Sequence, residues 1–297
     1  MPKTPELANL YWSAAGLYPG EGEISPYDFE TRVKSTARAG FTGIGLWHTD
    51  LEHILVNRTL RDVRAILDDN GVGAFEVEFI ADWFVDGQRR RESDARKKRL
   101  FEASAALSAH HIKVGDFYNT PVTMSRLIDE FGALCLEART IGATIGFEFM
   151  GSAMIHTLEE SRAMVEGAGQ DNGGLIVDIA HVTALDIPFA EVAQIPRRHL
   201  VAVELNDNVA KSAPGYSPGR RKFCGEGAFD IQGFVAACRA AGYDGPWAVE
   251  VFSPELTAVP IDELNTRAFG STMAALVAPA ARQPTLLSAS GPGRLLQ

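Results

Sequence analysis

Four short apolar runs in the second half of the chain decide the fold, and each carries at least one acidic residue close to its end. They read TIGFEFM (144–150), GLIVDIAH (174–181), LVAVELND (200–207) and WAVEVFS (247–253). Nearly continuous apolar runs are typical of strands buried on both faces, as in a parallel sheet covered by helices. These runs therefore predict consecutive parallel strands that each end beside a carboxylate.

The same alternation of short apolar runs and amphipathic stretches extends outward over most of the chain. Eight strand–helix units in roughly 280 residues match an α/β fold of the (β/α)8 TIM barrel type, in a single domain. A doubly wound sheet is the alternative, but no GxGxxG sequence follows an early strand. The expected strands are 10–16, 41–48, 73–79, 111–117, 144–149, 174–179, 200–205 and 247–252, and the expected helices lie near 26–38, 59–69, 91–108, 121–140, 157–167, 189–194, 230–241 and 261–277.

Length and composition set the limits of this domain. The 297 residues are 46% hydrophobic, which is enough for one large core. We expect the barrel to occupy residues 1–278. The remaining segment, PAARQPTLLSASGPGRLLQ (279–297), is rich in Ala, Pro, Ser and Gly and predicts an extended or disordered tail.

Charge and cysteine content exclude several classes of function. With 38 acidic and 28 basic residues, the net charge of −10 disfavours a nucleic-acid partner. No apolar run reaches the roughly 18 residues of a membrane span. The start, MPKTPELANLYW, lacks the layout of a secretion signal, and Cys135, Cys224 and Cys238 are too scattered for a disulfide framework. We therefore expect a cytoplasmic protein with no membrane partner.

The strand-end carboxylates predict a metal site. They stand at or near the carboxyl ends of four successive strands, where a parallel barrel builds its active site. One such residue could be a salt-bridged rim residue, but four converging carboxylates would repel one another unless a cation lay between them. An all-oxygen set favours one divalent ion, Mn²⁺ or Mg²⁺, with Co²⁺ and Zn²⁺ as alternatives. The predicted ligands are Glu148, Asp178, Glu204 and Glu250.

Five further residues are candidates for substrate binding. His181 follows Asp178 by three residues and could contact substrate, ligate the metal or cap a helix. His48 ends the second expected strand and either lines the mouth or serves the structure. Arg221 lies in a long glycine-rich loop (206–230) and could reach a substrate oxygen or phosphate, or form a solvated turn. Glu78 could hydrogen-bond a polyol hydroxyl, and Trp83 could form an apolar wall.

The ordered series FEFM, VDIAH, VELND, RxxxGEGxxD (221–230) and VEVFS resembles the xylose-isomerase-like barrel superfamily, often described as sugar phosphate isomerases and epimerases. The resemblance runs to about residue 277. It implies that the four strand-end carboxylates are metal ligands, that His181 contacts substrate and that Arg221 is the arginine preceding the loop glycines. Ketose epimerases of this group place a histidine where this chain has Glu204, so the site here is more anionic and closer to xylose isomerase itself.

Both the residues and the resemblance indicate chemistry on a sugar-like compound. A metal that chelates a carbonyl oxygen and the neighbouring hydroxyl would stabilise the enediolate. This intermediate forms when the carbon next to the carbonyl loses its proton. Glu148 or Glu250 would take that proton, and the other would return it. This predicts a carbohydrate isomerase or epimerase acting on a ketose or related polyhydroxy carbonyl compound. Expelling a β-hydroxyl or another leaving group would instead make the enzyme a dehydratase or lyase, and the resemblance implies a keto-inositol, dehydroshikimate or 3-keto-glycoside type substrate for that reaction.

Two other classes share this barrel. An apurinic endonuclease is disfavoured because the loop after the seventh strand offers Asp207 and no histidine, and because the chain is acidic. A non-catalytic barrel that binds a sugar or serves as a partner subunit is the second. The resemblance also implies a homodimer or homotetramer.

Overall fold

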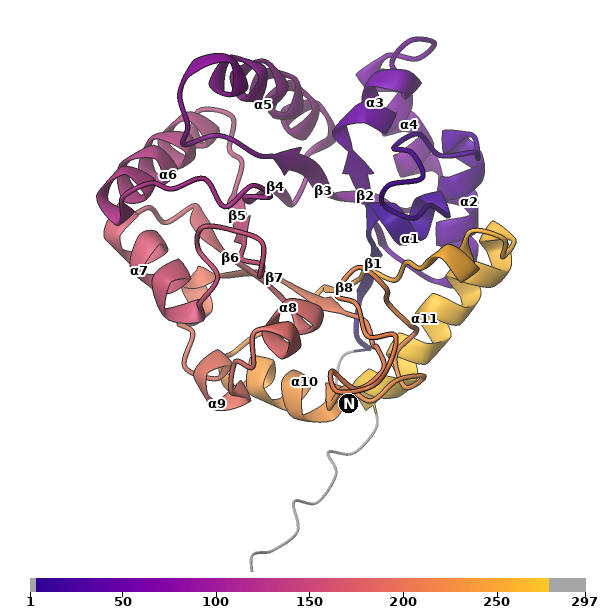
Figure 1. Cartoon of the computed structure of the whole chain (residues 1–297). Helices are drawn as coiled ribbons and strands as arrows, with labels where there is room; N and C mark the ends of the chain where they lie inside the picture. Colours follow the sequence, from indigo (N-terminus) through magenta and orange to yellow (C-terminus); the bar gives the residue numbers. More distant parts are fainter. Residues whose placement is uncertain (1–3, 278–297) are drawn as a thin grey trace, which may run out of the picture.

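Eight parallel strands close into one barrel, which confirms the predicted fold. A computed structural model describes residues 4–277 and shows the ring of strands surrounded by helices (Figure 1). Each strand pairs with its neighbours in sequence order, and β1 pairs with β8 to close the ring. The strands are β1 (Leu7–Asn9), β2 (Gly43–Trp47), β3 (Gly73–Ile80), β4 (His111–Val114), β5 (Ile145–Glu148), β6 (Gly173–Asp178), β7 (Leu200–Leu205) and β8 (Trp247–Val249).

The helices form the outer layer, and most of them lie near their predicted positions. The sequence analysis did not expect three short helices, α1 (Tyr11–Ala15), α3 (His48–Ile54) and α8 (Ile179–Ala184), and the last two begin directly after strands β2 and β6. The helices are α1 (Tyr11–Ala15), α2 (Phe29–Ala39), α3 (His48–Ile54), α4 (Leu60–Asp69), α5 (Gly87–Leu107), α6 (Met124–Arg139), α7 (Leu158–Ala168), α8 (Ile179–Ala184), α9 (Phe189–Val192), α10 (Ile231–Ala240) and α11 (Ile261–Val277), with short 3-10 turns η1 (Arg197–His199) and η2 (Pro254–Leu256).

The first expected strand, 10–16, is wrong. The strand is the preceding segment, Leu7–Asn9, and residues 11–15 form helix α1. Every residue of α1 is buried, and the helix ends at Gly16, which has a left-handed backbone (φ 64°). A short apolar run looks the same whether it is a buried strand or a buried helix, so periodicity could not separate the two.

Local side-chain contacts explain where several helices begin. Thr59 and Asp62 form a capping box at the start of α4, in which each side chain accepts a hydrogen bond from the other residue's backbone. Thr123 and Thr157 cap α6 and α7 in the simpler way, by accepting one backbone N–H. These caps fix the residue at which each of the three helices begins.

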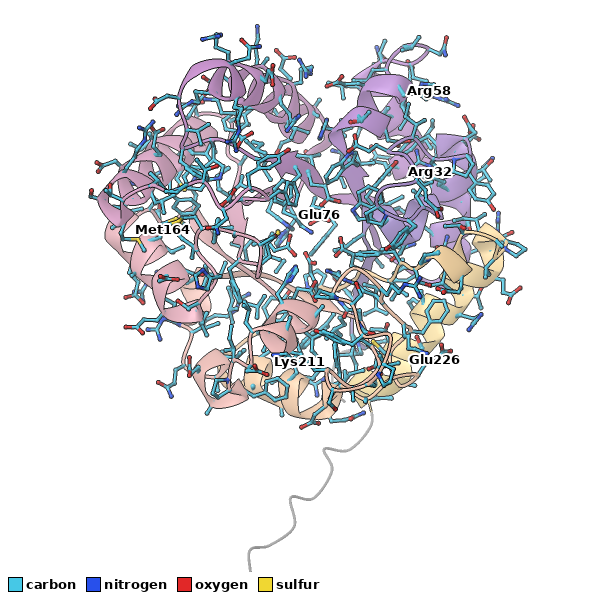
Figure 2. The ribbon with its side chains drawn as sticks, in the orientation of Figure 1. Arg32, Arg58, Glu76, Met164, Lys211 and Glu226 are labelled. Atoms are coloured by element: carbon cyan, nitrogen blue, oxygen red, sulfur yellow. The ribbon has the colours of Figure 1, made fainter. Side chains whose placement is uncertain are left out.

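The barrel interior is filled partly by polar side chains, and glycines make room for them. A Cβ atom on Gly45 of β2 would lie 3.0 Å from Glu76 Oε1. A Cβ on Gly146 of β5 would lie 2.8 Å from the Ile176 side chain and 3.2 Å from His111. Figure 2 shows Glu76 near the centre of the ring. The small residues of β2 and β5 therefore give space to the large side chains of β3, β4 and β6.

Gly146→Ala is expected to lower the free energy of unfolding by about 1–3 kcal/mol, because the added methyl group would overpack a filled interior. Gly270→Ala is the matched control. Gly270 lies in helix α11 with no neighbouring atom within 4 Å of an added Cβ, and alanine there is expected to stabilise by about 0.5–1 kcal/mol. Urea unfolding of both variants measures the difference, and equal midpoints would contradict the tight packing.

The predicted tail, 279–297, lies outside the described residues. Within residues 4–277, no helix combines the length and the apolar character needed to cross a membrane.

Candidate metal centre

The four predicted ligands meet at the carboxyl ends of the strands. Glu148 and Asp178 are the last residues of β5 and β6, Glu204 lies one residue before the end of β7, and Glu250 directly follows β8. One carboxylate oxygen from each lies within 4.8 Å of the others, and all four residues are buried. The strand pairing brings Asp178 of β6 opposite Glu204 of β7. The sequence positions thus converge in space as the barrel topology predicts.

His181 joins this group from the first turn of helix α8. Its Nε2 lies 3.3 Å from Glu148 Oε1 and 3.9 Å from Asp178 Oδ2. Asp178 caps the same helix by accepting the backbone N–H of Ala180, and it also accepts a hydrogen bond from Asn206 at 2.8 Å. Because one oxygen of Asp178 is held by these two donors, its other oxygen faces the site.

Arg221 bridges two of the carboxylates. Its guanidinium lies 2.8 Å from Asp178 Oδ2, donates to Glu250 and stacks on the Phe252 ring at 4.5 Å. The side chain is 4% exposed, so this is a buried ion pair and not the solvated turn considered from the sequence. The surrounding carboxylates outweigh burial and keep the pKa of Arg221 above its usual value.

The long loop that carries Arg221 is fixed at its base by Asp207. The Asp207 carboxylate accepts the backbone N–H groups of Gly225 and Gly227, both at 2.9 Å. Its backbone also pairs with that of Lys222 in an antiparallel bridge. A Cβ on Gly227 would lie 2.2 Å from Asp207 Oδ1, so a glycine is required there. These contacts return the loop to the mouth of the barrel, where Arg221 enters the site.

A lysine beneath the mouth is a buried neighbour of the predicted ligands that the sequence analysis did not identify. Lys113 of β4 is 1% exposed, and its Nζ lies 2.8 Å from Glu204 Oε1. The same nitrogen lies 3.4 Å from Glu76 and 3.4 Å from Glu78. It is also 3.8 Å from Glu148 and 3.9 Å from Glu250. Strand alternation was the available signal, because HIKV (111–114) places a charged residue on an inward-facing position.

The buried charges shift one another's pKa values in opposite directions. Burial raises the pKa of Glu204 well above its usual value, and Lys113 only partly opposes this. Burial would also raise the pKa of Glu148, but Lys113 and His181 outweigh it and the pKa is lowered. For Lys113 itself, burial disfavours the charge, yet the surrounding carboxylates raise the pKa well above the usual range.

This donor set fits a divalent cation. The four ligands are carboxylates, which suit hard ions such as Mg²⁺ and Mn²⁺. Glu204 is completely buried, and its Oε2 accepts no hydrogen bond from the described residues. A buried carboxylate oxygen without a donor is expensive, and an ion coordinated there would satisfy it. The overlapping group of Glu148, Asp178 and His181 could also hold an ion, so His181 stays an alternative ligand.

Metal binding is expected to release protons. The pKa of Glu204 is raised in the metal-free protein, so a fraction of the molecules still carries a proton on Glu204 above pH 4.5. A cation that binds there must displace this proton. The apparent affinity for Mn²⁺ should therefore rise with increasing pH over the range where Glu204 titrates. Titration calorimetry in two buffers of different ionisation enthalpy measures the protons released. Glu204→Gln should reduce that release, and an unchanged release would contradict the assignment.

A cavity of about 380 Å³ opens above the carboxylates. Glu78, His181 and Arg221 line it, as predicted from the sequence. Its apolar walls are Trp12 and Trp47, together with Phe79, Phe117, Met150 and Phe252. The walls are aromatic and the floor is acidic, which suits a compound with an apolar face and several hydroxyl groups.

The two remaining candidates lie elsewhere. Trp83 is 3% exposed, donates to the Gly115 carbonyl at 3.2 Å and packs on Phe131 between the barrel and its helices, so Trp12 and Trp47 form the wall in its place. His48 lines a neighbouring cavity of about 550 Å³ with Arg96. Burial and Arg96 lower the pKa of His48 to about 4, so this histidine is neutral at pH 7.

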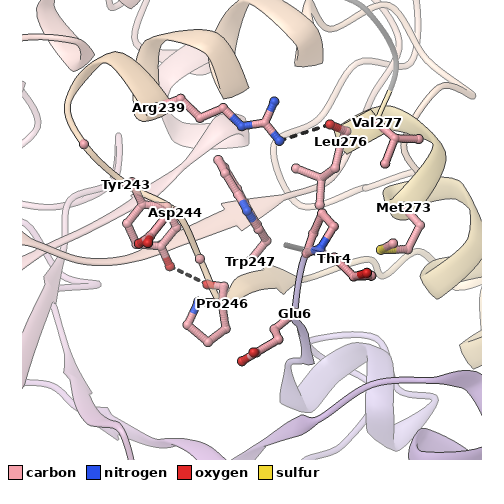
Figure 3. Close-up of a pocket in the computed structure, with 13 residues that line it drawn as sticks. Thr4, Glu6, Arg239, Tyr243, Asp244, Pro246, Trp247, Met273, Leu276 and Val277 are labelled. Atoms are coloured by element: carbon pink, nitrogen blue, oxygen red, sulfur yellow. Dashed lines mark hydrogen bonds between the residues drawn. The ribbon is translucent and has the colours of Figure 1, made fainter. Parts of the chain in front are cut away.

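A larger cavity, of about 810 Å³, lies at the opposite end of the barrel around Trp247, the first residue of β8 (Figure 3). Two of its polar side chains, Arg239 and Tyr243, donate to the backbone carbonyls of Leu276 and Pro246. Among the described residues, two overlapping groups could hold a metal ion, and both lie at the carboxyl ends of the strands. They are Glu148, Asp178 and His181, and Glu148, Asp178, Glu204 and Glu250. The candidate site is therefore the smaller cavity above the carboxylates.

The chain belongs to the xylose isomerase-like TIM barrel family, and the sequence model of that family matches residues 33–269. Among solved structures, the IOLI protein with a bound zinc atom superposes with a TM-score of 0.81 at 17% identity, covering 91% of this chain and 98% of that one. D-psicose 3-epimerase, solved in the presence of D-fructose, superposes with a TM-score of 0.69 at 15% identity, covering 90% and 96%. These likenesses confirm the fold.

Two kinds of enzyme are similar in sequence. The 3-dehydroshikimate dehydratase of Pseudomonas aeruginosa is 29% identical over 240 residues, which is 77% of this chain and 37% of that enzyme. The inosose isomerase of Bacillus velezensis is 25% identical over 128 residues, covering 42% of this chain and 46% of that enzyme. The matched segments thus span less than half the length of either relative.

Proposed function

We propose that this chain is a divalent-metal-dependent enzyme that removes a proton next to the carbonyl group of a sugar-like polyhydroxy compound. The observation that carries this proposal is the convergence of four buried strand-end carboxylates beneath an aromatic-walled cavity. Glu148, Asp178, Glu204 and Glu250 would hold the ion, with Mn²⁺ or Mg²⁺ favoured by the oxygen donors. When bound, such an ion is a Lewis acid that stabilises negative charge on substrate oxygens.

The chain's own residues would supply the proton transfers. Glu148 and Glu250 come from β5 and from the end of β8, so they reach the cavity from different strands. One carboxylate would take the proton and the other would return it, giving isomerisation or epimerisation. His181 lines the same cavity beside Glu148 and would donate a hydrogen bond to a substrate oxygen. Glu78 would accept one from a hydroxyl group.

Dehydration is the second candidate outcome, and the longest sequence similarities favour it. The two 3-dehydroshikimate dehydratases, of Pseudomonas aeruginosa and Pseudomonas putida, each match 77% of this chain, whereas the inosose isomerase of Bacillus velezensis matches 42%. Elimination begins with the same proton removal. A group in the cavity would then protonate the departing hydroxyl, and His181, which is 13% exposed, would be that group.

Metal-loaded protein incubated with 3-dehydroshikimate, keto-inositols, ketohexoses and 3-keto-glycosides is expected to convert one of these compounds and to lose that activity with EDTA. Mass spectrometry then separates the outcomes, because elimination removes water whereas isomerisation conserves mass. In deuterium oxide, isomerisation should also place deuterium on the carbon next to the carbonyl. Conversion that persists after complete metal removal would contradict the proposal.

A further inference from the structure

Lys113 lies among five carboxylates but is not one of the residues that line the cavity. Its nearest contact is Glu204, at 2.8 Å, and both side chains are essentially inaccessible to solvent. It also contacts Glu76, which is completely buried, and Glu78, which lines the cavity. The proton transfers proposed above assign no role to this lysine.

The arrangement around Lys113 resembles the surroundings of a bound cation. Oxygens of Glu76, Glu78 and Glu204 lie within 3.4 Å of its nitrogen, and those of Glu148 and Glu250 within 3.9 Å. Glu204 faces two ways, because Oε1 contacts Lys113 while Oε2 accepts no hydrogen bond from residues 4–277. Three of the four predicted metal ligands, Glu148, Glu204 and Glu250, therefore lie within 3.9 Å of the ammonium group, and Glu204 is the nearest of them.

We propose that Lys113 is a built-in cation of the metal centre. Its ammonium group fills a position beneath the mouth that a second metal ion would otherwise occupy, and it holds Glu204 in place before the first ion arrives. This inference rests on the proposed metal centre. It predicts that the protein takes up one divalent ion per chain and that the metal-free barrel depends on Lys113 for its stability.

Two substitutions test charge and space separately. Lys113→Ala opens room among Glu76, Glu78 and Glu204, so this variant is expected to bind two Mn²⁺ ions per chain where the wild type binds one, counted by native mass spectrometry and elemental analysis. Lys113→Met fills the space without charge. Its metal-free form is expected to melt roughly 10 °C below the metal-free wild type, because a buried carboxylate has lost its partner.

Two controls separate the loss of the ion pair from general damage. Lys113→Met combined with Glu204→Gln should regain most of the lost melting temperature, since the unpaired carboxylate is gone. Lys34→Met removes an exposed lysine, 49% accessible, that pairs with Glu30 along helix α2, and it should melt within about 2 °C of the wild type.

The possible failures can be told apart. One Mn²⁺ per chain in folded Lys113→Ala, or an unchanged melting temperature in Lys113→Met, would overturn the role of Lys113 while leaving the metal centre intact. A wild-type protein that binds no divalent ion would overturn the metal centre and this inference together. If Lys113→Ala does not fold, the role of Lys113 is tested by the melting temperatures of Lys113→Met and of the double variant Lys113→Met with Glu204→Gln.

Discussion

Glu250→Gln is expected to lower kcat by about 10²–10⁴-fold, the usual contribution of a positioned acid–base group. Glutamine keeps the shape and one neutral oxygen donor but can neither take nor return a proton. Steady-state rates on the substrate found by mass spectrometry measure the loss, and Mn²⁺ affinity measured by calorimetry separates weaker metal binding from lost proton transfer. At saturating Mn²⁺ the rate loss should persist.

Glu263→Gln is the matched control for that variant. Glu263 lies on helix α11 with its side chain 58% exposed, 3.8 Å from Arg267 and on the outside of the barrel. Its rate should equal that of the wild type. Wild-type turnover by Glu250→Gln would exclude a two-carboxylate mechanism and leave Glu148 as the one remaining carboxylate of the proposed pair.

Arg221→Met is expected to lower the free energy of unfolding of the metal-free protein by about 3–5 kcal/mol, because it leaves Asp178 and Glu250 buried without their shared partner. Methionine can still pack against Phe252, so the effect reports mainly the lost charge. Saturating Mn²⁺ should restore more stability to this variant than to the wild type, since the ion would neutralise the same two carboxylates. Chemical unfolding with and without Mn²⁺ measures both quantities.

The neighbouring arginine provides the comparison for this variant. Arg220 is 49% exposed and pairs at 3.2 Å with Glu255, which is 65% exposed. Such exposed pairs contribute little, so Arg220→Met should unfold close to the wild type. Equal unfolding of Arg220→Met and Arg221→Met would mean that the buried bridge does not stabilise the barrel.

Much of the candidate site could be predicted because strand geometry is regular. Glu148, Asp178, Glu204 and Glu250 occupy similar positions on successive strands, and a closed parallel barrel brings such positions to one end. The convergence therefore followed from one-dimensional spacing alone. His181 follows Asp178 at the end of β6 by three residues, so its approach to the same end of the barrel was expected. Arg221 lies farther along the long loop, and the sequence left open whether it reached the site or formed a solvated turn.

Contacts across the ring could not be predicted in this way. Lys113 of β4 meets Glu204 of β7 inside the barrel although the two strands are three places apart in the ring, and no spacing along the chain encodes that approach. The positions of Trp83 and Trp12 could not be told apart from the sequence either. Both are aromatic residues close to a strand, and only the packed structure places the first in the core and the second on the cavity wall.

The anchoring of the long loop by Asp207 has an evolutionary consequence. Because that carboxylate fastens both ends of the insertion to the barrel rim, the stretch between them, residues 209–219, can change its sequence without disturbing the acidic floor. Pro218 and Gly219, near the end of this stretch, contribute to the cavity wall. Substitutions there would alter which molecules enter while the chemistry below is retained, so a single scaffold could diversify into enzymes of different preference through one exchangeable segment.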